Sequence, residues 1–129
     1  MDRADIEARF RAYIDNINAA RFDAAVGFYH ETFDYDDQPF SRAQMRDLFA
    51  AVQAMVPDSH VEIRQLIIDG DHLSVRLRRT GTAVMPFFGI PTNGQPAALA
   101  EHTVYRFRDG RVDAVWAVID LAPLLAAAG

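Results

Sequence analysis

The sequence contains no cysteine. A disulfide framework, thiol chemistry and thiolate ligation of a metal are therefore excluded. It also lacks any run of basic residues, and its formal net charge is −5 at pH 7. An acidic chain without a basic patch is not expected to bind nucleic acid.

Long apolar runs are absent as well. No stretch approaches the length that spans a bilayer, so we expect no membrane partner. Residues 1–7 are charged and lead into a predicted helix, without the apolar segment of a secretion signal. We therefore expect the protein to be cytoplasmic.

What is present is typical of a globular protein. The chain has 129 residues, of which 50% are hydrophobic. This length predicts a single domain over residues 1–129, large enough to bury a core but too small for two. We find no internal repeat and no low-complexity linker.

The first half of the chain has the apolar spacing of helices. Residues 5–19 predict an amphipathic helix, and residues 22–30 a shorter one. Residues 33–36 alternate aromatic and acidic side chains, as a short strand does. Ser41 and Gln44 then form a capping-box pattern, which predicts a third helix that ends before Pro57.

After Pro57 the apolar pattern changes to alternation, which predicts strands at residues 60–68 and 72–82 around Asp69-Gly70-Asp71. A three-residue loop aligns Ile63 with Leu77, whereas a two-residue loop mismatches the faces. We therefore predict the three-residue loop.

Residues 101–120 contain the strongest local signal. Two runs of β-branched and aromatic residues flank Asp109-Gly110, a pair typical of a two-residue hairpin turn. If Arg108 and Arg111 close this turn, alternation places one set of side chains on a shared face. The members of this set are Glu101, Thr103, Tyr105, Phe107, Val112, Ala114, Trp116, Val118 and Asp120.

Asp120 ends this otherwise apolar face. A buried carboxylate must be paired, hydrogen-bonded or shifted in pKa, so Asp120 is our leading candidate for a catalytic residue. Alternatively it caps a short terminal helix over residues 121–127, because Asp is a favoured N-cap residue. Glu101 either shares the interior with Asp120 as a second acid or lies exposed at the start of its strand.

Residues 81–95 are too apolar for a solvated loop and too rich in glycine and proline for a strand. Such a segment covers a pocket mouth or a partner surface, or it closes the core. Met85, Phe87 and Phe88 are its candidate ligand contacts.

The order of elements is helix, helix, short strand, helix, four strands and a terminal helix. This segregation predicts an α+β fold in which a strongly curved antiparallel sheet wraps around the N-terminal helices. The interior of such a cone is a natural site for a ligand.

Several short motifs resemble those of the SnoaL-like polyketide cyclases, which have the NTF2-like cone fold. The matching residues are Pro57-Asp58, Asp69-Gly70-Asp71 with Arg76, Gly81-Thr82, Phe88 to Gly94, Tyr105-Arg106-Phe107, Asp109-Gly110, and Trp116 followed by Asp120. The resemblance implies a cofactor-free intramolecular aldol closure with Asp120 as the general acid/base. It also implies a homodimer. The histidine that follows Gly-Thr in the family is Ala83 here, a departure that bears on the substrate.

A second resemblance is to the ketosteroid isomerases, which share this fold. They place a tyrosine on the first helix and a base at the end of the first strand. Tyr13, and Asp37 or its neighbour Asp36, match these positions. The second acid of that family is Thr103 here.

The remaining candidates follow from residue chemistry. Tyr13, Tyr35 and His30 are possible proton donors, and Trp116 flanks the acid. Arg76 is either an outer salt-bridge partner of Glu62 or a clamp for a substrate carboxylate. The four histidines lack the spacing of metal ligands, so we expect no metal. The sequence has no glycine motif that binds phosphate, and the resemblance to the cyclases implies that no cofactor is needed.

These observations favour acid/base catalysis on a hydrophobic, polyketide-like small molecule that carries a carbonyl group, giving cyclisation or isomerisation. Two alternatives remain. The same pocket could open an epoxide by activating water, or the protein could bind a ligand without catalysis.

Overall fold

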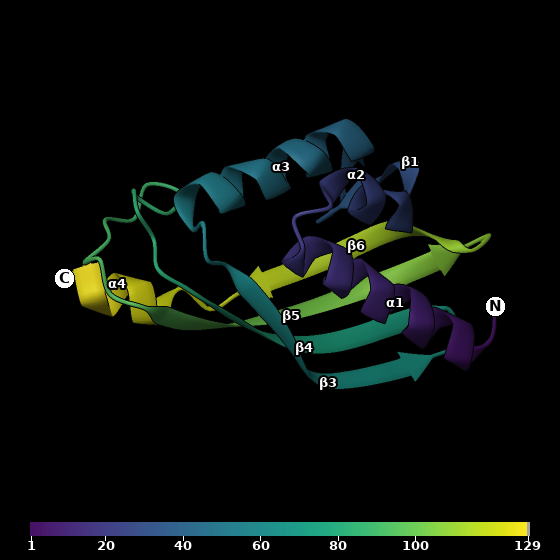
Figure 1. The fold of residues 1–129 in the computed structure, drawn as a ribbon. Helices are drawn as coiled ribbons and strands as arrows, with labels where there is room; N and C mark the ends of the chain where they lie inside the picture. Colours follow the sequence, from purple (N-terminus) through teal and green to yellow (C-terminus); the bar gives the residue numbers. More distant parts are fainter. Residues whose placement is uncertain (129) are drawn as a thin grey trace.

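The computed structural model describes residues 1–128, so the last residue of the expected domain lies outside the described residues. Along the chain, its elements are (Figure 1) α1 (Arg3–Asn18), α2 (Phe22–Ala25), the 3-10 helix η1 (Val26–Phe28), β1 (Tyr29–Tyr35), β2 (Gln38–Ser41), α3 (Arg42–Met55), β3 (His60–Asp69), β4 (His72–Gly81), β5 (Ala97–Arg108), β6 (Arg111–Ile119) and α4 (Ala122–Ala128).

One sheet of six strands organises the fold, in the order β2-β1-β6-β5-β4-β3. All neighbouring pairs are antiparallel except β1 and β6, which run parallel. Figure 1 shows the sheet curving beneath α1 and α3, with α4 at the far end. The predicted α+β cone, with a curved sheet around N-terminal helices, is confirmed.

The helices form where local signals place them. Asp2 caps α1, because its carboxylate accepts a hydrogen bond from the backbone N–H of Asp5 at 2.9 Å. The capping box at the start of α3 is confirmed, since Ser41 and Gln44 exchange both hydrogen bonds. The second helix is shorter than predicted, because its last turn is the 3-10 helix and β1 already begins at Tyr29.

The hairpin between β3 and β4 differs from the prediction. Asp69 pairs with His72, so the loop has two residues rather than three. The register then shifts between Ile63 and Gln65, where a bulge adds one residue to β3. This bulge restores the expected pairing of Ile63 with Leu77, and the pattern alone cannot distinguish it from a longer loop.

The hairpin between β5 and β6 has the predicted turn. Asp109 and Gly110 both have positive φ, and Arg108 pairs with Arg111. Beyond the turn, Phe107 pairs with Val112 but Arg106 pairs with Ala114, so Asp113 is an extra residue in β6. From this bulge onwards, every side chain of β6 lies on the face opposite to the predicted one.

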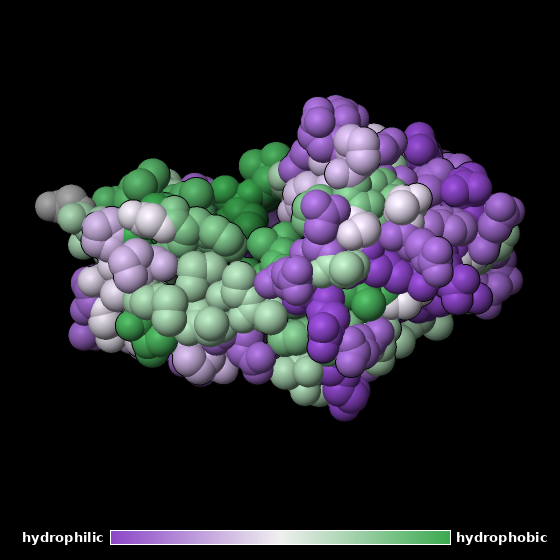
Figure 2. All heavy atoms as spheres, turned by 90° about the horizontal axis from the view of Figure 1, so that it is seen from above, coloured by the Kyte–Doolittle hydropathy of each residue, from purple (hydrophilic) through white to green (hydrophobic). Residues whose placement is uncertain are grey.

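The core lies between the helices and the concave face of the sheet, where Phe10, Tyr29 and Leu73 are among the fully buried residues. Figure 2 looks down on the helices. The surface of the helical half is mostly hydrophilic, whereas the end that carries the C-terminus is mostly hydrophobic, and a hollow lined by hydrophobic residues opens between them. No helix among residues 1–128 combines the length and apolarity needed to cross a membrane.

Candidate active site

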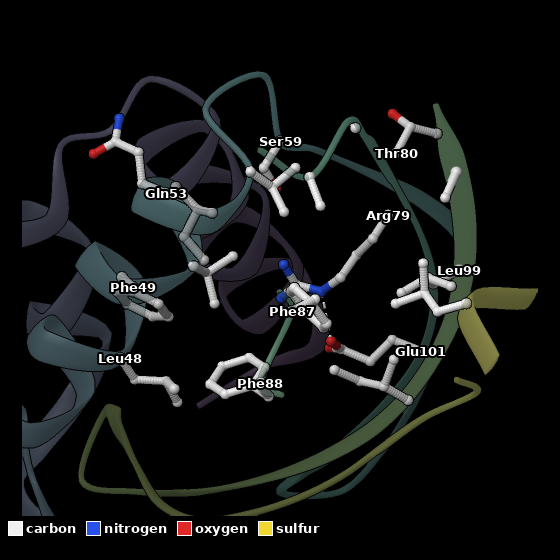
Figure 3. Close-up of a pocket in the computed structure, with 18 of the residues that line it drawn as sticks. Leu48, Phe49, Gln53, Ser59, Arg79, Thr80, Phe87, Phe88, Leu99 and Glu101 are labelled. Carbon is white, nitrogen blue, oxygen red and sulfur yellow. Dashed lines mark hydrogen bonds and ion pairs between the residues drawn. The ribbon is translucent and has the colours of Figure 1, made fainter. Parts of the chain in front are cut away.

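A cavity of about 500 Å³ lies between the concave face of the sheet and the helices. This volume is within the range of sites that hold small molecules, roughly 300–1,000 Å³. Its wall combines α1, α3, α4, the inner face of β4 to β6 and the loop that follows β4. Most lining side chains are apolar, among them Leu48 and Phe49 of α3, Leu99 of β5 and Phe87 of the loop (Figure 3).

Two opposite charges face this cavity. Glu101 of β5 is 5% exposed, and its Oε1 accepts a hydrogen bond from Nε of Arg79 at 2.7 Å. Its Oε2 accepts a second bond from Oγ1 of Thr103 at 2.9 Å. Figure 3 shows Arg79 and Glu101 extending from the sheet toward the centre of the cavity. Among the described lining residues, Glu101 is the only one with a carboxylate and Arg79 the only one with a cationic side chain.

Strand alternation explains why these two meet. Arg79 follows Leu73, Val75 and Leu77 on the inner face of β4, and Glu101 opposes Leu77 across the sheet. Burial acts to lower the pKa of Arg79, but the adjacent Glu101 carboxylate outweighs it and raises that pKa. The guanidinium therefore stays charged. Removing Arg79 would leave the Glu101 carboxylate as an uncompensated buried charge, which is strongly destabilising.

Buried phenols form a second polar group of the cavity. Tyr13, Tyr29 and Tyr105 all line it and are at most 4% exposed. The hydroxyls of Tyr13 and Tyr29 lie 2.6 Å apart. Burial raises the pKa of all three, and also that of the half-buried Tyr35. The phenols therefore remain neutral hydrogen-bond donors at physiological pH.

Five of the predicted site residues line the cavity: Glu101, Tyr13, Tyr35, Phe87 and Phe88. The structure brings Glu101 and the tyrosines to one interior. The other six lie elsewhere: Asp120, Asp37, Trp116, His30, Met85 and Arg76. Met85 belongs to the loop at the cavity mouth but is 44% exposed and is not part of the lining.

The predicted interior position of Asp120 is wrong. The Asp113 bulge places Ala117 and Ile119 opposite Thr103 and Glu101 on the cavity side, which leaves Asp120 exposed beyond the end of β6. Its Oδ1 accepts a hydrogen bond from the backbone N–H of Ala122 at 3.0 Å. The alternative interpretation, a cap of the terminal helix, therefore fits the observed contact.

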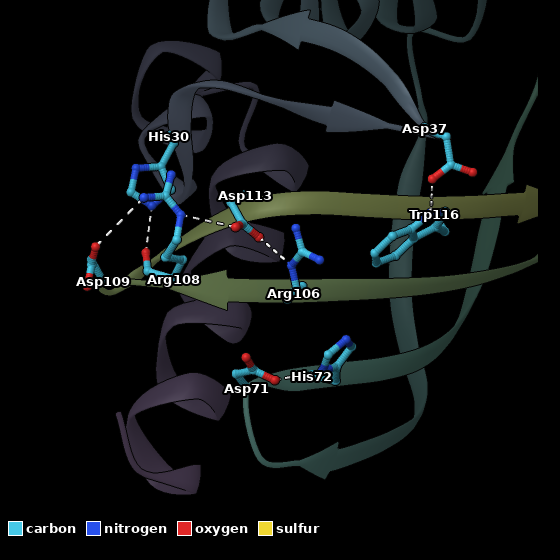
Figure 4. Close-up of polar contacts among 9 residues, drawn as sticks. All are labelled: His30, Asp37, Asp71, His72, Arg106, Arg108, Asp109, Asp113 and Trp116. Carbon is cyan, nitrogen blue, oxygen red and sulfur yellow. Dashed lines mark hydrogen bonds and ion pairs between the residues drawn. The ribbon is translucent and has the colours of Figure 1, made fainter.

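Trp116 and Asp37 meet on the outer face of the sheet, as Figure 4 shows. The indole N–H of Trp116 donates to Asp37 at 3.0 Å, and the guanidinium of Arg106 lies 5.9 Å from the centre of the indole ring. Asp37 itself sits in the tight turn between β1 and β2 with positive φ. Neither residue lines the cavity. The bulge at Asp113 turns Trp116 outward.

His30 lies at the turn of the β5–β6 hairpin, where its Nε2 donates to the carbonyl oxygen of Arg108 at 2.5 Å (Figure 4). Arg76 lies on the outer face of β4, since it alternates with the buried Val75 and Leu77. Its expected partner Glu62 pairs with Arg64 instead.

Sequence reasoning missed Arg79, Tyr29 and Tyr105 as polar residues of the cavity. The sequence did contain a signal for Arg79. Side chains alternate along a strand, so Arg79 must lie on the same face of β4 as the apolar residues from Leu73 to Leu77. The sequence contained no such signal for the two tyrosines, because an aromatic residue at a core position has the same pattern whether or not its hydroxyl faces a cavity.

The Pro57-Asp58 and Gly81-Thr82 motifs meet at the rim of the cavity. Oδ1 of Asp58 accepts a hydrogen bond from the backbone N–H of Thr82 at 2.7 Å. This contact ties the end of β4 to the segment after α3, and so fixes two walls of the cavity relative to each other.

The polar groups of the cavity can move a proton and stabilise a charged oxygen. They comprise one carboxylate, one guanidinium and several neutral phenols within an apolar wall. Within residues 1–128, no cluster of three or more His, Asp or Glu residues is suited to hold a metal ion.

Comparisons with a family model and with a solved structure both point to the SnoaL-like polyketide cyclases. The sequence model of the SnoaL-like polyketide cyclase family matches residues 7–128. A SnoaL-like polyketide cyclase of known structure from Agrobacterium tumefaciens is 28% identical, with a TM-score of 0.86 over 94% of this chain and 95% of that chain.

Two further structures share the fold. TsrD from Streptomyces laurentii is 21% identical, with a TM-score of 0.90 over 100% of this chain and 98% of that one. AclR from Streptomyces galilaeus, a proposed hydroxylase, is 24% identical, with a TM-score of 0.85 over 99% and 98%. A comparison with curated protein sequences yields no match.

Proposed function

This chain belongs to the SnoaL-like polyketide cyclase family, and from that premise we propose that it catalyses a cofactor-independent cyclisation or isomerisation with Glu101 as the general acid/base. The substrate is a hydrophobic, polyketide-like small molecule with a carbonyl group. The observation that carries this proposal is that Glu101 is the one carboxylate among the described residues that line the cavity.

The chemistry requires a base beside an acidic carbon. Glu101 takes a proton from the carbon next to the substrate carbonyl, which leaves an enolate. In a cyclisation the enolate carbon attacks a second carbonyl of the same molecule, and the new alkoxide takes the proton back from Glu101. In an isomerisation the same proton returns to a different carbon. Both routes regenerate the carboxylate without a net change in atoms.

The enolate oxygen needs a hydrogen-bond donor. The Tyr13 hydroxyl lines the cavity, and its hydrogen bond with Tyr29 holds it in place. Because burial raises the pKa of both tyrosines, their hydroxyls keep the protons that they donate. We assign Tyr13 the role of this donor.

The family resemblance implies that Asp120 is the general acid/base, but we assign this role to Glu101 because of its position. A general base must come within hydrogen-bond reach of the proton that it removes. Asp120 is exposed and bonded to the backbone of α4, whereas Glu101 faces the cavity.

Epoxide opening remains the second candidate, and one observation favours it. A water molecule attacking an epoxide needs at least two polar groups around it, and Glu101 with its partner Thr103 supplies them. Oxygen-18 from solvent would enter the product of this reaction but not the product of ring closure.

The family resemblance also leads us to propose a homodimer. Two apolar side chains on the outer face of the sheet are exposed, Val118 at 69% and Ile67 at 55%. Association through this face would cover them. A monomer mass in sedimentation equilibrium would contradict this proposal, and the cytoplasmic location likewise stays a prediction.

The experiment measures proton exchange on 2-tetralone, an apolar bicyclic ketone with acidic hydrogens next to its carbonyl group. Deuterium incorporation from heavy water is followed by NMR. The wild-type protein should accelerate it, and Glu101→Gln should lower that acceleration by about 10²- to 10⁴-fold, the usual contribution of a general base.

Asp120→Asn is the matched control and should exchange at the wild-type rate. Near-ultraviolet circular dichroism checks that both variants are folded. Undiminished exchange in Glu101→Gln would refute the assignment. Bound ketone without exchange in the wild-type protein would instead support a binding protein without catalysis.

A further inference from the structure

Arg79 has more hydrogen-bond donors than its partner uses. A guanidinium carries five N–H groups, and Glu101 accepts from Nε alone. The two terminal nitrogens have no hydrogen-bond acceptor within residues 1–128. They are accessible to solvent, because the described residues include no buried side-chain nitrogen or oxygen that lacks a hydrogen-bond partner, and the Arg79 side chain is 22% exposed.

Figure 3 shows where these nitrogens point. They extend past Glu101 into the cavity, toward the side that carries Leu48 and Phe49. Oε2 of Glu101 is held by Thr103, so the carboxylate stays beside Nε and leaves the other edge of the guanidinium open. The open edge thus faces the space that a ligand would occupy.

The surroundings of the open guanidinium edge favour the binding of a carboxylate. No other cationic residue lines the cavity among the described residues, and the chain contains no lysine. The neighbouring wall is apolar, through Phe87, Phe88 and Leu99. A charge pair in such surroundings interacts more strongly than it does in water, and a guanidinium edge matches a carboxylate with two parallel hydrogen bonds.

We propose that the open edge of Arg79 is an anion subsite that binds a carboxylate of the substrate, so that the protein takes hydrophobic carboxylic acids in preference to their neutral esters. This inference rests on the proposed function for its account of why the ligand lies beside Glu101. Docked on the open edge, the carboxylate orients the apolar body of the ligand along the cavity and holds its carbonyl-bearing part near Glu101.

The test compares two probes that differ only in charge, 2-naphthoic acid and methyl 2-naphthoate, by isothermal titration calorimetry near neutral pH. The wild-type protein should bind the acid at least about 10-fold more tightly, as expected for a charge-assisted hydrogen bond. Arg79→Gln should abolish this preference. Arg76→Gln, a change on the outer face of the same strand, is the matched control and should retain it.

Glu101→Gln separates this inference from the proposed function. It removes the proposed base and also the negative charge that competes for Arg79, so it should abolish proton exchange yet strengthen binding of the acid. If Arg79→Gln fails to fold because Glu101 is left unpaired, the double variant Arg79→Gln/Glu101→Gln replaces the ion pair with two neutral amides.

Equal affinity of the wild-type protein for acid and ester would overturn the subsite. So would a preference for the acid that persists in Arg79→Gln or in the double variant. Because binding is measured without turnover, an active Glu101→Gln variant would refute the proposed function and leave the subsite standing.

Discussion

Alkaline pH should destabilise the protein through the tyrosines on the cavity wall. Burial raises the pKa of Tyr13, Tyr29 and Tyr105 in the folded protein, whereas in the unfolded chain a tyrosine titrates near 10. A raised pKa in the folded state contributes stability that is fully present below about pH 10. This contribution is lost as the pH rises further, because the unfolded chain then releases protons that the folded protein retains.

The magnitude follows from the number of buried phenols. One pH unit above the unfolded value, each buried tyrosine lowers the free energy of unfolding by about 1.4 kcal/mol. The three together therefore remove about 4 kcal/mol at about pH 11, a large part of the roughly 5–15 kcal/mol that stabilises a typical domain. Tyr35 is half-buried and adds a smaller share.

Urea unfolding followed by circular dichroism at about pH 8 and about pH 11 measures this loss. Tyrosinate absorbance should rise together with unfolding and not before it. Tyr105→Phe is the control, and should reduce the loss between the two pH values by about a third, or about 1.4 kcal/mol. Tyrosinate that forms near pH 10 while the protein stays folded would refute both the burial of these phenols and their role as neutral donors.

Two substitutions test the placement of residues around the cavity. Asp120→Ala should lower the free energy of unfolding by about 1 kcal/mol, because it removes the cap of α4, and should leave tetralone exchange intact. Urea unfolding and the exchange assay check this, and a loss of exchange in the folded variant would show that Asp120 acts in the site. Gly81→Ala should cost about 1–3 kcal/mol in urea unfolding, because the added Cβ would overlap Cγ1 of Val56 and lie 3.1 Å from Oδ1 of Asp58. An unchanged stability would contradict the close approach of β4 to this segment.

Much of the fold could be predicted from the sequence, because the signals involved are local. The apolar spacing of α1, the capping box of Ser41 and Gln44, and the Asp109-Gly110 turn depend on neighbours a few residues away. The side chains at these positions restrict the backbone directly. The order of helices and strands then limited the architecture to an α+β cone.

Only the tertiary structure decided which acid faces the cavity. Val118 and Ile119 are both apolar, so alternation along β6 is compatible with either register. The choice depends on the bulge at Asp113, whose carboxylate accepts hydrogen bonds from both Arg106 and Arg108 of the neighbouring strand.

That one extra residue turns Trp116 and Asp120 away from the interior and leaves Glu101 there with Arg79. Arg79 and Glu101 come from different strands and meet only when the sheet forms. The sequence alone therefore determined the cone and its helices, whereas packing between strands determined the polar centre of the cavity.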